Sequence, residues 1–327
     1  MTVRHIRAAV GSSVRTSVRA STWGLRTGVG LGVRRLVDLP VVPSVPEGHR
    51  LDLPGRGSAY VIDVPGPRPD SPTVVLLHGL ATTAHLSWFT ALGPLAEHHR
   101  VVALDLRWHG RGIHGGRFRV ADCADDVAAV LDELGIDDAV MAGYSLGGAV
   151  AQELWRRHPD RVSGLVLCST AARWRDLRRE ALFFGVLGLA MHPLSRVASG
   201  RVARRAAGLP DLPGLDSSDL TAWGLTELRS TSGWTLPEVM AELGRFDSRS
   251  WLGEVDVPTT VLVTSRDGAI PAERQRALGA AIPGAVVLDA PGGHASIFLD
   301  HARWVPLFLE AVASVTDRLP TPGRLAG

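Results

Sequence analysis

The chain has 327 residues, of which 45% are hydrophobic and 21% charged, as is typical of a globular protein with a large core. A formal net charge of +2 excludes the strong positive field that would attract nucleic acid over the whole surface, so no nucleic-acid partner is expected. The two cysteines, Cys123 and Cys168, suggest neither a disulfide framework nor a zinc site.

The sequence predicts neither a membrane span nor export, because it has no run of about 18 apolar residues and no signal-peptide pattern. A cytoplasmic location is therefore expected. Residues 1–37 carry seven arginines before the first acid, Asp38. Apolar residues at helical spacing there would suit a basic helix on an anionic membrane surface, and an arginine-rich, acid-poor stretch is also typical of targeting segments. Gly11-Ser12-Ser13 argues against a stable helix and favours a loosely ordered extension, with a linker, over residues 1–47.

From residue 48 onward, short apolar runs alternate with helical patterns, as in a parallel sheet covered by helices. The run Thr73–Leu77 is continuously apolar, which is typical of a strand covered on both faces. Gly55-Arg56-Gly57 predicts a hairpin turn between the first two strands. Strands are predicted at 49–53, 59–64, 73–77, 100–106, 162–167, 259–264 and 285–288, and helices at 88–96, 121–134, 149–157 and 297–315.

The most informative stretch is Gly143-Tyr144-Ser145-Leu146-Gly147, which lies between a buried strand pattern and a helical pattern. A serine on a sharp strand-to-helix turn has a strained backbone and an exposed hydroxyl. Glycine is needed at 143 and 147 because side chains there would collide across the turn. The following helix directs its N-terminal amides at the serine, which suits a developing anion. This context predicts that Ser145 is a nucleophile.

Four separated motifs resemble those of the α/β-hydrolase family. They are His78-Gly79-Leu80, the stretch 143–147, Asp267-Gly268-Ala269-Ile270-Pro271 and Gly292-Gly293-His294, and they follow the family's order of Ser, Asp and His. The resemblance runs from about Arg50 to Val315. It implies an α/β fold with a mostly parallel eight-stranded sheet flanked by helices, and with a helical cap inserted after the sixth strand.

The resemblance also suggests a division of the chain. The hydrolase core would comprise residues 48–170 and 251–316, and the cap would comprise residues 171–250. In the cap segment, helical runs such as 175–189 and 237–246 are separated by clusters of Gly, Pro, Ser and Asp. Residues 317–327 are expected to form a disordered tail.

A serine hydroxyl needs a base within hydrogen-bond reach, and the base needs an orienting group. His294, on a glycine-flanked loop after a strand, is predicted to be the base. Asp267 is predicted to hold one tautomer of His294 and to stabilise the imidazolium, although its position beside Pro271 would also suit a helix cap. Asp247 and Asp289 are weaker alternatives for the acid.

The family resemblance implies an oxyanion hole formed by two backbone N–H groups. One belongs to Leu146, directly after the nucleophile, and the other to Leu80, after His-Gly. His78 would then shape the loop and take no part in proton transfer.

The segment Asp105–Gly112 departs from the family pattern Asp-x-x-Gly-His-Gly-x-Ser, because Trp108 replaces the first glycine and Gly112 the serine. The departure should alter the loop beside the pocket without touching the triad. Asp105, His109 and His114 could be imagined as metal ligands, but a polar loop rim is the preferred interpretation, and no metal site is predicted. The residues expected to line a substrate pocket are Leu80, Tyr144, Trp108, Trp174, Phe183 and Trp223.

The predicted function is hydrolysis of a hydrophobic small-molecule ester or lactone through a Ser-His-Asp acyl-enzyme mechanism, without a cofactor. The same fold also serves carbon–carbon bond hydrolases, amidases, acyltransferases and cofactor-free perhydrolases. Haloalkane dehalogenases and epoxide hydrolases use an aspartate nucleophile where this chain has Ser145. A noncatalytic ligand-binding protein is a remote alternative, because every triad and oxyanion position is filled.

Overall fold

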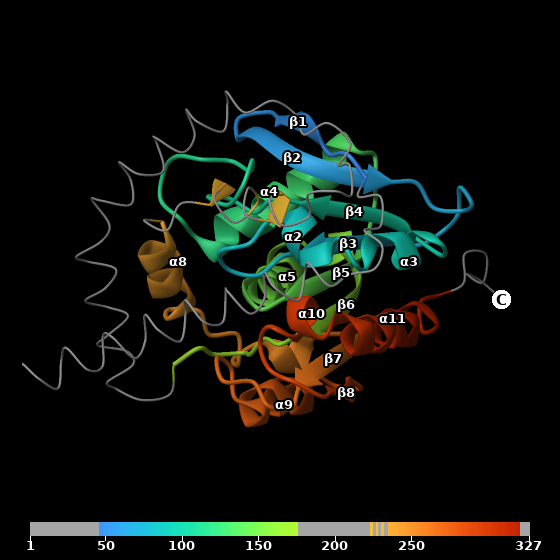
Figure 1. Ribbon diagram of the computed structural model, residues 1–327, viewed down its shortest axis with the longest axis vertical. Helices are drawn as coiled ribbons and strands as arrows, with labels where there is room; N and C mark the ends of the chain where they lie inside the picture. The colour runs from blue at the N-terminus through green and yellow to red at the C-terminus, as the bar shows by residue number, and fades with distance from the viewer. Residues whose placement is uncertain (1–45, 176–222, 225–226, 228–229, 232–234, 321–327) are drawn as a thin grey trace, which may run out of the picture.

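In the computed structural model, eight strands form one sheet in the order β1-β2-β4-β3-β5-β6-β7-β8 (Figure 1). The structure describes residues 46–175, 223–224, 227, 230–231 and 235–320. The β1–β2 and β2–β4 pairs are antiparallel and all other pairs are parallel, which confirms the predicted mostly parallel sheet. The strands are β1 His49–Leu53, β2 Gly57–Val64, β3 Thr73–Leu77, β4 Arg100–Leu104, β5 Ala139–Tyr144, β6 Val162–Cys168, β7 Thr259–Thr264 and β8 Val286–Ala290.

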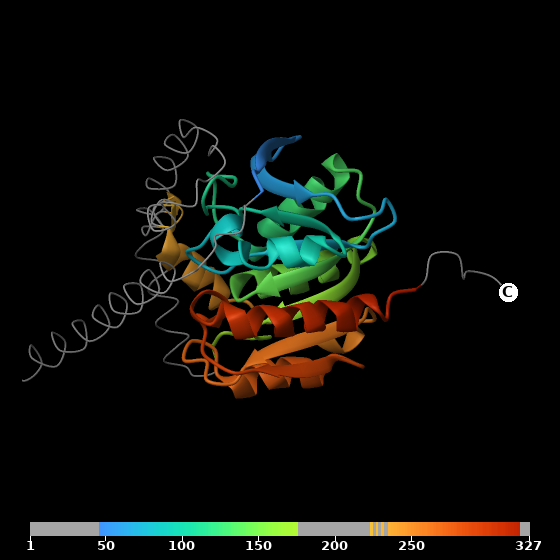
Figure 2. The ribbon, with the colours of Figure 1, turned by 45° about the vertical axis from the view of Figure 1, so that its right-hand side comes forward.

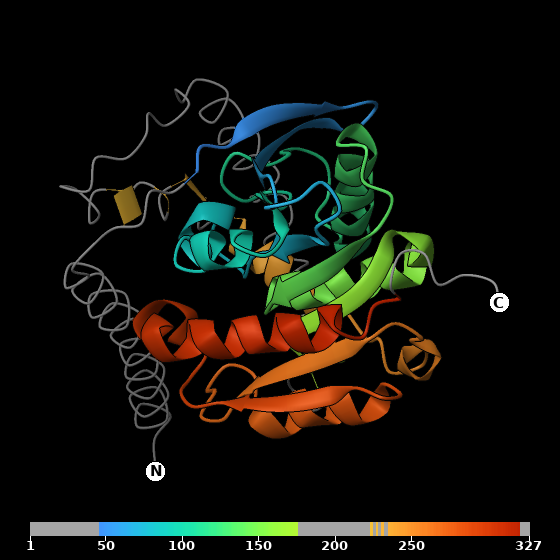
Figure 3. The same cartoon turned by 90° about the vertical axis from the view of Figure 1, so that its right-hand side faces the viewer.

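Helices cover both faces of the sheet, because each central strand directs alternate apolar side chains to opposite sides. In β3, Val75 and Leu77 join a core cluster beneath α4, α5 and α9, whereas Val74 and Leu76 join a second cluster beneath α2, α3, α10 and α11. Figure 2 shows the β1–β2 pair and the β7–β8 pair at opposite edges of the sheet, and Figure 3 shows α11 on the same side as α2 and α3. The helices are α2 Ala84–Trp88, α3 Leu92–Ala96, α4 Val120–Glu133, α5 Leu146–Arg157, α8 Leu236–Leu243, α9 Ala272–Ala281, α10 Ser296–Leu299 and α11 His301–Thr316.

Two predicted helices are each divided in the structure. The segment 88–96 is not one helix: α2 begins after Thr83, whose hydroxyl accepts the N–H of Leu86 at 3.1 Å, and α3 begins only at Leu92. This start places Pro94 in the first turn of α3, where its missing N–H is not needed, whereas a helix from Trp88 would have held it in the interior. Likewise, α10 and α11 together replace the single helix predicted at 297–315.

The carboxyl ends of the parallel strands bring the predicted motifs together. His78-Gly79 directly follows β3, Ser145 directly follows β5, and the loops after β7 and β8 carry Asp267 and His294. Ligand sites of open α/β sheets lie at this end of the strands. Segments more than 200 residues apart therefore meet at one edge of the sheet.

Four predicted parts lie wholly or largely outside the described residues. They are most of the cap, residues 176–189 of the helix predicted at 175–189, residues 1–45 of the extension and linker predicted at 1–47, and residues 321–327 of the tail. The domain division and the membrane contact of residues 1–37 therefore stay predictions. Of the 171–250 segment, α8 is described, and the carboxylate of Glu227 forms a buried ion pair with Arg111 at 2.8 Å. Among the described residues, no helix combines the length and apolar character needed to cross a bilayer.

Candidate active site

Ser145 occupies a sharp turn between β5 and α5. Its backbone has φ 54° and ψ −113°, in the left-handed half of conformational space, which costs a non-glycine residue on the order of 1–3 kcal/mol. A Cβ at Gly143 would collide with the carbonyl of Gly147, and a Cβ at Gly147 with the carbonyl of Leu77. The turn therefore requires both glycines, as the sequence predicts.

The side chains of Ser145, His294 and Asp267 form one hydrogen-bonded chain. His294 Nε2 lies 2.9 Å from Ser145 Oγ, and His294 Nδ1 lies 2.8 Å from Asp267 Oδ2. The hydroxyl of Tyr144 donates to the backbone carbonyl of His294, which ties the histidine loop to β5. This arrangement allows proton transfer between Ser145 and an imidazole that a carboxylate orients.

The two alternative acids lie in other surroundings. Asp247 forms a bidentate ion pair with Arg249, with both contacts at 2.8 Å. Asp289, on β8, pairs with Arg276 of α9 at 2.7 Å. Neither carboxylate has a hydrogen bond to His294 among the described residues, so the geometry favours Asp267.

Asp267 sits in a cradle of hydrogen-bond donors. Its Oδ1 accepts the backbone N–H groups of Ala269 and Ile270, both at 2.8 Å. Its Oδ2 accepts the Thr264 hydroxyl at 2.8 Å and the Gln275 amide at 3.2 Å, in addition to His294. Burial alone would raise the pKa of this carboxyl, but the hydrogen bond and charge interaction with His294, together with the other donors, leave the pKa below its ordinary value.

Thr264 and Gln275 are site residues that sequence reasoning missed. Thr264 is the last residue of β7 and Gln275 lies on α9, and both are fully buried. A threonine at a strand end and a glutamine within a helix form no recognisable motif. Their roles depend on α9 packing against β7, which no sequence pattern records.

The two backbone N–H groups predicted for the oxyanion hole flank Ser145. Leu146 is the first residue of α5, where N–H groups have no intrahelical acceptor. Leu80 follows Gly79, and a Cβ built on Gly79 would lie 3.6 Å from Cβ of Ser145. Neither N–H group has an acceptor in the part of the chain that the structure describes.

A cavity of about 350 Å³ opens beside Ser145. Of the predicted pocket residues, Leu80, Tyr144 and Trp174 line it, and Met240 and Leu243 of α8 and Phe298 of α10 complete its apolar wall. No carboxylate, arginine or lysine is among the described lining residues, which are Gly79, Leu80, Thr82, Tyr144, Ser145, Trp174, Met240, Leu243, Ala269, His294, Ala295 and Phe298.

Two other predicted pocket residues, Trp108 and Trp223, do not line this cavity. Trp223 is buried with its ring edge-on to Phe89, and Phe183 lies outside the described residues. Trp108 is fully buried beside Phe118, and its indole N–H donates to the Gly115 carbonyl at 3.1 Å. This position corrects the expectation that Trp108 lines the pocket. Trp108 has φ 67°, a left-handed conformation that favours glycine, the residue of the family pattern at this position, and burial of its ring offsets the steric cost.

Asp105 and His109 are buried, so the predicted polar loop rim is wrong. Asp105 accepts the N–H groups of Ala84 at 2.7 Å and Arg111 at 2.8 Å. His109 Nδ1 and His114 Nε2 bond to the carbonyls of Arg107 and Gly110. These side chains are therefore engaged with separate backbone groups, which belong to the loop after β4 and, for Ala84, to the first residue of α2.

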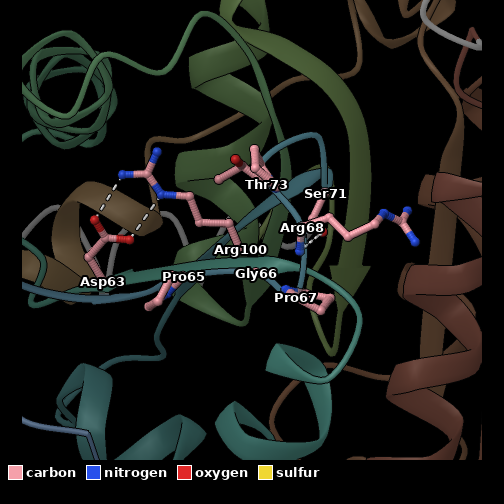
Figure 4. A pocket seen from close by; sticks show the side chains of 9 residues that line it. Asp63, Pro65, Gly66, Pro67, Arg68, Ser71, Thr73 and Arg100 are labelled. Carbon is pink, nitrogen blue, oxygen red and sulfur yellow. Dashed lines mark hydrogen bonds and ion pairs between the residues drawn. The ribbon is translucent and has the colours of Figure 1, made fainter.

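A larger cavity, of about 440 Å³, lies at the opposite end of the sheet, near the first residues of β3 and β4 (Figure 4). Its central cation, Arg100, forms a bidentate ion pair with Asp63 at 2.8 and 3.0 Å. Arg68 at its rim pairs with Asp70. By volume alone, this cavity would be chosen as the candidate active site. The nucleophile, base and acid, however, all lie at the other end of the sheet.

Two buried histidines should make the stability of the fold sensitive to acid. Burial lowers the pKa of His78 to about 4, and burial together with the nearby His78 lowers that of His109 to about 3. Both values lie below that of an unfolded histidine, near 6.5, so as the pH falls the unfolded chain binds protons first. Each histidine should remove about 1 kcal/mol of unfolding free energy between pH 7 and pH 5.5.

Urea unfolding of the wild type and of His109→Phe at these two pH values tests this expectation. The raised pKa of Asp105 acts in the opposite direction in both proteins, so the difference between them isolates the histidine. The loss of stability on acidification should be smaller in His109→Phe. Equal losses in the two proteins would contradict the prediction.

Comparison with known proteins identifies the family of this chain. A model of the family described as alpha/beta hydrolase fold matches residues 72–187. A pimeloyl-[acyl-carrier protein] methyl ester esterase of Neisseria meningitidis is 31% identical over 260 residues, which cover 78% of this chain and 80% of that protein. A hydrolase of Pseudomonas aeruginosa PA01 has a TM-score of 0.64 at 25% identity, covering 82% of this chain and 98% of the other. A thermophilic esterase of Thermogutta terrifontis has a TM-score of 0.62, also at 25% identity, covering 82% and 99%. The chain therefore belongs to the α/β-hydrolase family.

Proposed function

We propose that this protein is a serine hydrolase that cleaves a carboxylic ester, or a lactone, of a hydrophobic small molecule. The observation that carries the proposal is the hydrogen-bonded chain from Ser145 through His294 to Asp267, which opens on an uncharged cavity. A related protein named as a methyl ester esterase supports the same reaction class.

In the proposed mechanism, His294 Nε2 takes the proton of Ser145 as Oγ attacks the substrate carbonyl. The Asp267 carboxylate holds the Nδ1–H tautomer of His294 and stabilises the imidazolium. The N–H groups of Leu80 and Leu146 bind the oxyanion. His294 then protonates the leaving alcohol, and a water molecule, deprotonated by the same histidine, hydrolyses the acyl-enzyme.

The cavity supports a neutral, apolar substrate. The hydroxyls of Tyr144 and Thr82 already donate to protein carbonyls, so among the described lining side chains the polar hydrogens left for the substrate are those of the reaction centre and the indole N–H of Trp174. A volume of about 350 Å³ is near the lower end of small-molecule sites, which span about 300–1,000 Å³. Carbon–carbon bond hydrolysis, amide hydrolysis, acyl transfer and perhydrolysis use the same residues and are separated by substrate tests.

A matched pair of esters tests the preference for a neutral acyl group. Nitrophenyl butyrate should be hydrolysed at least about 100-fold more efficiently, in kcat/KM, than nitrophenyl hemisuccinate, because an unpaired carboxylate in the cavity would cost several kcal/mol. The two acyl chains have the same number of carbons, so the comparison isolates the charge. Comparable values for both esters would contradict the proposed substrate class.

Reaction with a fluorophosphonate probe tests the mechanism itself. The wild type should be labelled covalently at Ser145, and labelling should be absent from Ser145→Ala. An unlabelled wild type would favour a noncatalytic ligand-binding protein.

A further inference from the structure

The peptide group between Gly79 and Leu80 is anchored on the side opposite its N–H. The Gly79 carbonyl accepts a hydrogen bond from His78 Nδ1 at 2.7 Å and from the Thr82 hydroxyl at 2.8 Å. A peptide group is planar, and the described peptide bonds are all trans, so the Leu80 N–H points away from that carbonyl. The two donors to the carbonyl therefore set the direction of the proposed oxyanion donor.

Backbone partners determine the tautomer of His78. A carbonyl only accepts, so Nδ1 must carry the proton that the Gly79 carbonyl receives. Nε2 is then bare, and it accepts the N–H of Leu106 at 2.9 Å, just beyond β4. His78 is fully buried and remains neutral at physiological pH, with a pKa of about 4. It thus links the loop to the neighbouring strand segment and exchanges no proton with a substrate.

Thr82 is held in turn by Ser87. Because the Thr82 hydroxyl donates to Gly79, its oxygen accepts the hydroxyl of Ser87, at 2.7 Å. Ser87 is buried on α2, a helix packed against the sheet. Thr82 itself lines the cavity, yet its one hydroxyl hydrogen is already donated to the Gly79 carbonyl.

The loop needs this support because its own backbone is unfavourable. Ala81, between Leu80 and Thr82, has φ 65°, a conformation that costs a residue with a Cβ about 1–2 kcal/mol. A strained residue persists only where its surroundings hold it. Without the Thr82 hydrogen bond, the Gly79–Leu80 peptide group would have a single side-chain anchor, His78, and more freedom to rotate.

We propose that Thr82, supported by Ser87, is a positioning residue that aims the Leu80 N–H at the oxyanion. The inference rests on the proposed function. Thr82 need not contact the substrate, since it acts through the peptide group. Its contribution should appear in the transition state, where the oxyanion carries full charge, and should be small when the ester merely binds.

Thr82→Val tests the proposal, because it keeps the side-chain shape and removes the hydroxyl. We expect kcat for nitrophenyl butyrate to fall about tenfold, with KM within about twofold, since losing a donor altogether costs about 100- to 1,000-fold and a turned donor loses part of that. Thr82→Ser restores the hydroxyl and should recover most of kcat. Ser87→Ala should also lower kcat, but by a smaller factor than Thr82→Val does. The rate of fluorophosphonate labelling should follow kcat in all three variants.

Thr260→Val is the matched control. Thr260 is a buried threonine of β7 whose hydroxyl forms hydrogen bonds with Ser314 and Arg318, away from the cavity. The kcat of Thr260→Val should therefore stay at the wild-type value. Wild-type kcat in both Thr82→Val and Ser87→Ala would overturn the inference, as would a raised KM with unchanged kcat, which would make Thr82 a substrate-binding residue. If Thr82→Val does not fold, the kcat of Ser87→Ala alone tests the inference. Failure of the proposed function is seen separately, as an unlabelled wild type or an active Ser145→Ala.

Discussion

Ser145→Ala is expected to lower kcat for nitrophenyl butyrate by about 10⁶-fold, the loss found when the nucleophile of a serine hydrolase is removed. The substitution deletes one oxygen atom. It leaves His294 and Asp267 in contact, and it leaves the N–H groups of Leu80 and Leu146 in place. The remaining rate would come from those donors and from binding, but no acyl-enzyme could form.

The fold of Ser145→Ala should be intact, because alanine carries the same Cβ and its backbone is no more strained at φ 54° than that of serine. Circular dichroism and urea unfolding would check this point. Ser248→Ala is the matched control: Ser248 is equally inaccessible, but its hydroxyl bonds the Gln152 side chain away from the cavity, so activity should remain. A Ser145→Ala protein with most of its activity would disprove the nucleophile assignment.

Asp267→Asn is expected to lower kcat by about 10⁴-fold while leaving the protein folded. The hydrogen bonds around the Asp267 carboxylate explain why activity is lost while the fold is kept. The backbone N–H groups of Ala269 and Ile270 would hold the new amide oxygen in the Oδ1 position, and the amide NH₂ would face His294. Nδ1 could then only accept a hydrogen bond, so Nε2 would carry the proton and could not take one from Ser145.

Two matched substitutions accompany Asp267→Asn. Asp247→Asn and Asp289→Asn each remove a carboxylate that pairs with an arginine outside the site, and each should keep kcat within about twofold, because surface ion pairs contribute little. An inactive Asp247→Asn beside an active Asp267→Asn would transfer the acid role to Asp247.

The choice between these acids shows the limit of sequence reasoning. Motif order and strand context placed Ser145, Asp267 and His294 after three different strands, and the structure has them in hydrogen-bond contact. The sequence around Asp267 favoured the triad role but would also have suited a helix cap. In the structure the same carboxylate makes both kinds of contact: Oδ1 binds the turn before α9, and Oδ2 binds His294.

Local chemistry was sufficient to predict the strands and the glycine turn at Ser145, whereas the mostly parallel sheet was implied by the family resemblance and the order of its strands was known only from the structure. Apolar runs, helix patterns and glycines act over a few residues, and those interactions are readable along the chain. The boundaries of α2 and α3 were harder to predict from the sequence, because the Thr83 cap and Pro94 interrupt an apolar pattern that runs on without a break.

Only the tertiary structure decided which residues surround the reaction centre. Trp108 looked like a pocket residue but belongs to the core, whereas Met240 and Phe298, about 60 residues apart in sequence, share one cavity wall. Thr264 and Gln275 surround Asp267, and Thr82 supports the Gly79–Leu80 peptide group, through contacts between separate elements. Such roles depend on the direction of single hydrogen bonds in packed side chains. Residue identity and spacing do not carry that information, because the same side chain can face a core, a cavity or a neighbouring strand.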